Sequence, residues 1–114
     1  RDMGGAVDFL LRHDAVSGPS VGAIGFCMGG AMTLLISALQ GDRIGAAVPF
    51  YGAPLGDQAP EWAGLTAPVL GHFAENDDFF PPTAINAPHL PHDPAQLGSL
   101  AKIVSLAAMA MSLG

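Results

Sequence analysis

The sequence predicts an α/β fold, a mainly parallel sheet flanked by helices. Short apolar runs of strand length alternate with segments of helical periodicity, and glycine or proline residues separate them. The sharpest change lies between residues 21–26, an apolar run, and residues 28–40, a series of strong helix formers. Strands that alternate with helices in this way are expected to pair in parallel. Each helix carries the chain back to the end of the sheet where the previous strand began, so the next strand runs in the same direction.

The segment before this change completes a helix, a loop and a strand. Residues 2–13, DMGGAVDFLLRH, have a broad apolar face and are expected to form a helix that packs on the sheet. The turn-rich sequence DAVSGPS then leads into the strand at residues 21–26. The apolar residues of the predicted helix are Ala6, Val7, Phe9, Leu10 and Leu11.

Two further strands are expected after the central helix, which should end at Gly41 as a C-cap. Residues 44–51, IGAAVPFY, form a continuous apolar run of the buried-strand type, although Pro49 argues against complete hydrogen bonding at its centre. Residues 69–73 form the next apolar run. We interpret Trp62, in the long loop between them, as an anchor that holds the loop to the body, with a substrate-facing role as the alternative.

Composition limits the classes of partner. The chain has 114 residues, with four Lys and Arg against ten Asp and Glu, a net charge of −6. This balance argues against nucleic acid and against a polybasic membrane patch. A single cysteine excludes an internal disulfide, no signal peptide is visible, and the apolar residues 103–113 are too few to span a bilayer. We expect a cytoplasmic protein that acts on a small molecule without a cofactor; its oligomeric state is left open.

That cysteine stands at the turn between the strand and the helix. The sequence Gly25-Phe26-Cys27-Met28-Gly29 has the form G-x-C-x-G, where α/β-hydrolases carry the nucleophile of a G-x-S-x-G turn. Side chains at Gly25 or Gly29 are expected to crowd the strand and helix that meet there. The N–H groups at the start of the helix favour a thiolate at Cys27. The alternative is a small buried hydrophobic side chain.

Two stretches, GFCMGG and the later PVLGHFAENDDFFPP, resemble the dienelactone hydrolases, α/β-hydrolases with a cysteine nucleophile. The likeness covers about residues 1–82 and corresponds to the central part of a family domain. It implies hydrolysis of carboxylic esters or lactones, with Cys27 as nucleophile and the backbone N–H of Met28 as one oxyanion donor. A complete fold of this kind needs more strands than these residues supply, so we expect a partial fold, inactive as a fragment.

An acidic turn follows the third expected strand. The sequence AENDDFFP, residues 74–81, aligns Asp77 with the acid of the family pattern G-x-x-D-x-x-x-P, with Ala74 in place of the glycine. The order along the chain, nucleophile before acid, is that of the fold. The resemblance implies that Asp77 orients the catalytic histidine. The alternative is a carboxylate that solvates a loop.

The triad histidine is not evident in the sequence. The family places it well beyond the acid in a glycine-flanked loop, but residues 101–114 contain no histidine. His89 and His92 are the available candidates, and their position among prolines is more typical of an exposed loop. They lack a third ligand at a metal-binding spacing, so no metal site is predicted. We interpret His72, within an expected strand, as a core or supporting residue.

The composition changes at Thr83. Residues 83–114 contain two charged residues and no Phe, Trp or Tyr, and we interpret them as a divergent or frame-shifted tail. Helical spacing of apolar residues predicts one helix near residues 97–113. Two other functions compete with the enzyme: a non-catalytic remnant that depends on a partner, and a protein with a redox-sensitive thiol at Cys27.

Overall fold

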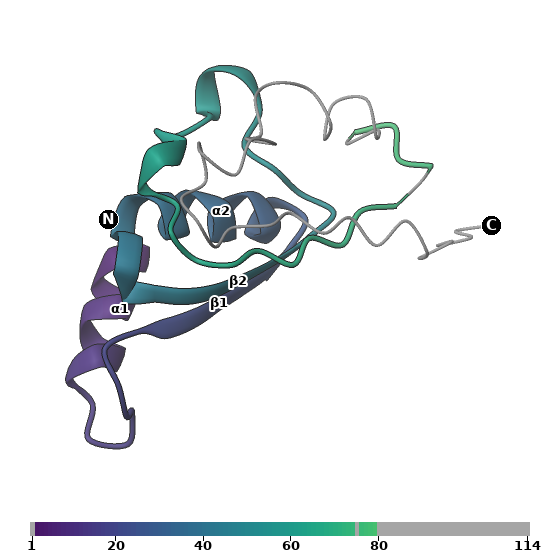
Figure 1. Cartoon of the computed structure of the whole chain (residues 1–114). Coiled ribbons are helices and arrows are strands. Elements are labelled where there is room, and N and C mark those ends of the chain that lie inside the picture. The colour runs from purple at the N-terminus through teal and green to yellow at the C-terminus, as the bar shows by residue number, and fades with distance from the viewer. Residues whose placement is uncertain (1, 75, 80–114) are drawn as a thin grey trace.

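The order of the elements follows the predicted alternation. The computed structural model describes residues 2–74 and 76–79. Its helices are α1 (Asp2–Arg12) and α2 (Met28–Gln40), and its strands are β1 (Val21–Phe26) and β2 (Ile44–Phe50). Short 3-10 turns lie at Gly41–Arg43, Gly56–Gln58 and Trp62–Gly64. Helix α2 lies along one face of the two strands (Figure 1). The two helices and the two strands expected within residues 2–51 are therefore confirmed.

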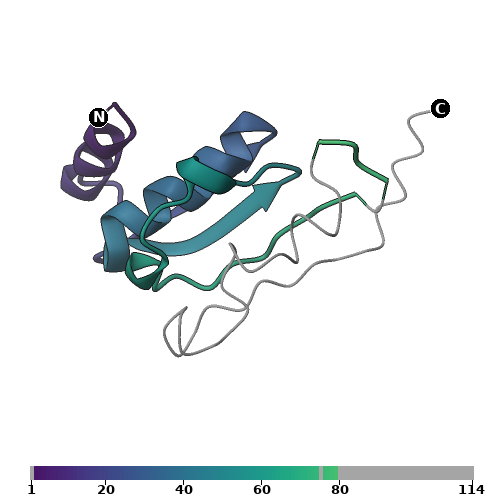
Figure 2. The same ribbon diagram turned by 90° about the horizontal axis from the view of Figure 1, so that it is seen from above.

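The sheet is parallel. β1 and β2 pair in the same direction, with Val21 opposite Ile44 and Phe26 opposite Phe50. Residues 68–72 continue the sheet beyond β2, through parallel bridges from Ala47 to Val69 and from Phe50 to His72. Figure 2 shows this segment running beside β2. The spatial order therefore equals the chain order, and all three carboxyl ends lie at one edge.

Pro49 explains why residues 68–72 form two bridges and no continuous strand. The Ala47 N–H donates to Pro68 O and the Leu70 N–H to Ala47 O, both at 3.0 Å. Farther along, the His72 N–H donates to Pro49 O at 2.9 Å. The intervening rung would need an N–H at position 49, which proline does not have. The prediction that Pro49 prevents complete pairing at the centre of this strand is confirmed.

The core lies between the sheet and the two helices. One cluster joins α2 to β2, to residues 69–73 and to the loop, with Trp62 packed against it, as the anchor interpretation predicts. A second cluster joins α1 to α2 and to the start of the strands. The buried members of the first cluster are Leu34, Ala38, Ala47, Ala53, Leu65, Val69 and Phe73, and those of the second are Val7, Ile36, Ile44 and Ala67.

The broad apolar face expected for the first helix is only partly buried. Val7 is buried and Leu11 packs partly against the second cluster, but Phe9 and Leu10 are exposed. Ala6 is exposed as well. The prediction that this apolar face packs on the body of the protein therefore holds for Val7 and Leu11 and was wrong for the three exposed residues. Periodicity identifies the apolar side of a helix, whereas the extent of its burial depends on the surface it meets.

The sheet face opposite α2 carries a row of rings. Gly25 is buried toward α2, so the alternation of β1 turns its neighbours Ile24 and Phe26 to the other face, where they are exposed. The Phe26 and Phe50 rings stack with centroids 4.7 Å apart, and those of Phe50 and His72 stack at 4.4 Å. This ring face therefore crosses β1, β2 and residues 68–72.

Two further sequence predictions concern membrane-spanning helices and the C-terminal tail. No helix in the described ranges is long and apolar enough to cross a membrane. The predicted tail from Thr83 and the helix near residues 97–113 lie outside the residues that the structure describes.

Replacement of Leu34 by alanine tests the core. Leu34 lies on α2 with 1% of its surface exposed, whereas Leu39, on the same helix, is 71% exposed. We expect Leu34→Ala to lower the free energy of unfolding by about 2–5 kcal/mol, because the lost burial leaves a cavity. The same change at Leu39 should alter the free energy of unfolding by no more than about 0.5 kcal/mol, because this side chain is mostly exposed and its removal leaves no cavity. Urea unfolding measures both, and equal losses would contradict this core.

The ion pair between Asp8 and Arg43 makes a pH-dependent contribution. A hydrogen bond and the charge of Arg43 hold the pKa of Asp8 below its ordinary value, and Arg12 adds a smaller effect. Because this pKa is lower in the folded chain, the pair stabilises the fold above the ordinary aspartate range. That contribution is lost as the pH falls through the folded pKa.

Substitution of each arginine separates the two effects. Arg43→Gln should raise the pKa of Asp8 toward its ordinary value, and Arg12→Gln should raise it less, because Arg12 acts only through its charge. Carboxyl-carbon NMR titration of Asp8 measures both shifts. A larger rise in Arg12→Gln than in Arg43→Gln would reverse the assignment.

Candidate active site at the carboxyl edge of the sheet

Cys27 occupies a sharp turn between β1 and α2. Its φ of 56° and ψ of −121° lie outside the helical and strand regions, in a range that non-glycine residues rarely adopt. The Cys27 N–H donates to Phe50 O at 3.0 Å, and its carbonyl oxygen accepts from the N–H groups of Gly30 and Ala31 at 2.9 and 3.3 Å. Hydrogen bonds to other backbone groups thus fix both the N–H and the carbonyl group of Cys27, while the residue itself is exposed. The alternative of a buried hydrophobic cysteine is wrong.

The glycines beside Cys27 differ in what they permit. A Cβ at Gly25 would lie 2.0 Å from the Gly29 carbonyl oxygen, so this position requires glycine, as predicted. A Cβ at Gly29 would meet nothing within 4 Å, so the same prediction for Gly29 was wrong. The strand contacts the carbonyl group of Gly29, whereas a side chain at Gly29 would point into open space. At Gly30, a Cβ would lie 2.6 Å from Phe50 O, a requirement that the motif did not identify.

Met28 is the first residue of α2. The first N–H groups of a helix have no carbonyl partner within that helix, so they point out of its N-terminus. The Met28 side chain is 72% exposed and is therefore not part of the core.

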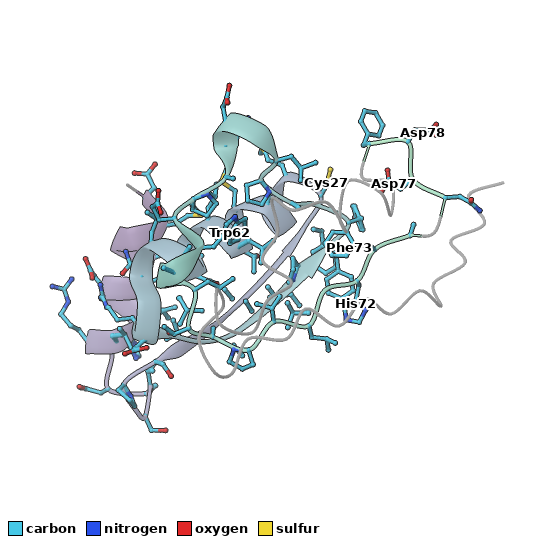
Figure 3. The ribbon with its side chains drawn as sticks, turned by 45° about the horizontal axis from the view of Figure 1, so that its top comes forward. Cys27, Trp62, His72, Phe73, Asp77 and Asp78 are labelled. Carbon is cyan, nitrogen blue, oxygen red and sulfur yellow. The ribbon has the colours of Figure 1, made fainter. Side chains whose placement is uncertain are left out.

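Asp77 lies at the same edge of the sheet as Cys27. Because residues 68–72 run parallel to β1 and β2, both the turn after Phe26 and the turn after Phe73 lie at the carboxyl edge (Figure 3). Asp77 is half-buried, and its Oδ1 accepts a hydrogen bond from the Phe79 N–H at 2.8 Å. Asp78, which the family pattern does not align with the acid, is exposed.

The described histidines lie away from this edge or on the other face of the sheet. His13 follows α1, where its Nδ1 accepts from the Ala15 N–H at 3.1 Å. The half-buried His72 stacks on Phe50 within the ring face, opposite α2. His89 and His92 lie outside the described residues. Within residues 2–74 and 76–79, no group of three metal-ligating side chains is brought together.

A model of the dienelactone hydrolase family matches residues 1–90 of the chain. Three curated relatives are similar over much of the same region. "Protein usf" of Aquifex pyrophilus is 35% identical over 74 residues, 65% of this chain and 32% of its own length. A carboxymethylenebutenolidase of Pseudomonas putida is 32% identical over 80 residues, 70% of this chain and 33% of its own.

The third relative is a probable 2-oxo-3-(5-oxofuran-2-ylidene)propanoate lactonase of Bradyrhizobium sp. It is 34% identical over 86 residues, 68% of this chain and 34% of its own. The chain therefore spans about a third of the length of these relatives. The family match, which covers most of the chain, agrees with a parallel sheet and helices that form part of an α/β-hydrolase fold. The chain belongs to the dienelactone hydrolase family.

Proposed function

We propose that this chain carries the nucleophile of a site that hydrolyses carboxylic esters or lactones. The observation that supports this most is the position of Cys27, exposed at a positive φ between β1 and α2 in a chain of the dienelactone hydrolase family. An enzyme with this arrangement presents the nucleophile at the edge of the sheet, where a substrate carbonyl has access to it.

The proposed reaction proceeds through an acyl-thioester. The Cys27 thiolate attacks the substrate carbonyl carbon, the Sγ–C bond forms, and the C–O bond of the ester breaks as the alkoxide leaves and takes a proton. The Met28 N–H is proposed as one donor to the oxyanion, because it opens α2 directly after the nucleophile. Water then cleaves the thioester, which releases the acid and restores the thiol.

Asp77 is proposed as the acid that orients the base. Its place at the carboxyl edge and its position after Cys27 in the chain support this role. His72, which stacks on Phe50 in the ring face, is not suited to act as the base at Cys27. The base is therefore unassigned, and His89 and His92 are the candidates within this sequence.

The proposed substrate is a small-molecule ester or lactone. One relative is named a lactonase, and the name supports lactones as the class to test first. The net charge of −6 argues against nucleic acid or an anionic membrane surface as the partner, and a cytoplasmic location fits a protein with one unpaired cysteine.

A partner-dependent, non-catalytic fragment is the second candidate. The ring face supports it, because Ile24 and Phe26 are 65% and 54% exposed and Leu70, also outside the core, is 40% exposed. A redox-sensitive thiol, the third candidate, requires only the exposed Cys27. Acylation with turnover favours the enzyme, acylation without release the fragment, and selective reaction with peroxide the sensor.

An activated ester tests the nucleophile. With p-nitrophenyl acetate, we expect the 114-residue chain to release at most about one equivalent of nitrophenolate and to retain the acetyl group on Cys27. A hydrolase that lacks its base loses several orders of magnitude in turnover. The burst amplitude and the intact mass after reaction measure both quantities. Cys27→Ala should abolish the burst.

Steady turnover would overturn the expectation of a missing base. If many equivalents are released and Cys27→Ser abolishes the release, a histidine of this chain supplies the base. His89→Gln and His92→Gln then identify it, with His13→Gln as the matched control at a site away from Cys27. A burst that survives in Cys27→Ala would contradict the proposed nucleophile itself.

A further inference from the structure

The end of β2 holds the Cys27 peptide from two sides. Phe50 O accepts the Cys27 N–H at 3.0 Å, and two residues later the backbone of Gly52 lies against the Cys27 carbonyl. A Cβ at Gly52 would lie 1.8 Å from Cys27 O and 3.2 Å from the N atom of Ala31. Gly52 is buried, so this contact is closed to solvent.

Tyr51, between these two contacts, takes a conformation that is rare for its type. Its φ is 35°, and a positive φ in a bulky residue is a genuine departure from the allowed regions. The Tyr51 N–H donates to His72 O at 2.7 Å, which ties this turn to the neighbouring segment. The backbone thus turns sharply at Tyr51, and this turn brings Gly52 against the carbonyl of Cys27.

We propose that Gly52 is a positioning residue for Cys27, which keeps the thiol at the N-terminus of α2 because its lack of a side chain lets β2 close on the Cys27 peptide. Gly52 lies outside the G-x-C-x-G motif. Even so, its requirement for glycine is more stringent than that of Gly29, which lies inside the motif and has free space for a Cβ. This role of Gly52 rests on the proposed role of Cys27, but its test measures the position of the thiol and does not depend on ester hydrolysis.

Gly64 provides the matched control. A Cβ there would lie 2.2 Å from the Ala38 carbonyl oxygen, a comparable clash with the backbone of the same helix, but near its opposite end. Gly52→Ala and Gly64→Ala should therefore both destabilise the fold, whereas only Gly52→Ala should displace Cys27. Gly29→Ala adds a third variant, next to Met28 but without a clash.

The readout is the rate of alkylation of Cys27 by iodoacetamide at neutral pH, at a temperature where each variant is folded by circular dichroism. Displacement of the sulfur from the first N–H groups of α2 should lower this rate about two- to fivefold, because those groups stabilise the negative charge on the attacking sulfur. We expect this loss only for Gly52→Ala. A Gly52→Ala rate equal to that of the wild type or of Gly64→Ala would overturn the inference.

If Gly52→Ala does not fold, two double variants test the proposal instead: Cys27→Gly combined with Gly52→Ala, and Cys27→Gly combined with Gly64→Ala. Glycine at position 27 can adopt backbone angles that cysteine resists, so its carbonyl can move away from the added Cβ. Under the proposal, Cys27→Gly should restore folding to Gly52→Ala, as measured by urea unfolding of the double variant, and should not restore Gly64→Ala to the same extent. Failure to rescue would overturn it. The ester burst tests the nucleophile separately, so its failure would not imply that the alkylation or the rescue experiment fails.

Discussion

The close approach of the β1 backbone to the first turn of α2 determines the geometry of the turn at Cys27. Gly25 lies so near the Gly29 carbonyl that no side chain fits between strand and helix. On the helix side, the Thr33 hydroxyl turns back to donate to Gly29 O at 2.8 Å, which leaves a small, satisfied surface toward the strand. With helix and strand in contact, the residue that connects them has to turn within a single position. That residue is Cys27, at a positive φ.

Strain at one residue persists only where its surroundings fix the backbone on several sides. At Cys27 the N–H is held by β2, the carbonyl by the first turn of α2, and both contacts need glycine nearby, at Gly30 and Gly52. The parallel pairing then brings the turn of Asp77 to the same edge. Main-chain packing therefore creates an exposed thiol at the start of a helix, with a carboxylate at the edge it shares. The chemistry that we propose is a consequence of this arrangement.

The local features of this fold could be predicted from the sequence, and the tertiary ones only in part. The bounds of α1, β1 and α2 follow from apolar periodicity and from Gly41, and the pairing gap follows from Pro49, because each depends on neighbouring residues. Phe9 and Leu10 belong to the apolar face that was expected to pack on the sheet, yet both are exposed, because the sequence does not reveal which surface covers a helix. The role of Gly52 was missed because it meets Cys27 only through the closure of β2, and no local pattern marks it. The base cannot be identified by this route either, since a triad forms from residues that are distant in the chain.

We expect that folding, and not the cysteine alone, makes Cys27 reactive toward a carbonyl. A β-lactone probe measures this directly, through the rate of Cys27 acylation in the native chain and in the same chain unfolded in urea, both at neutral pH and corrected for the effect of urea on a free thiol. Acylation should be faster in the native chain, because only the folded turn places the sulfur beside the N–H groups of α2. Equal rates in the two states, or a faster reaction of the unfolded chain, would contradict it.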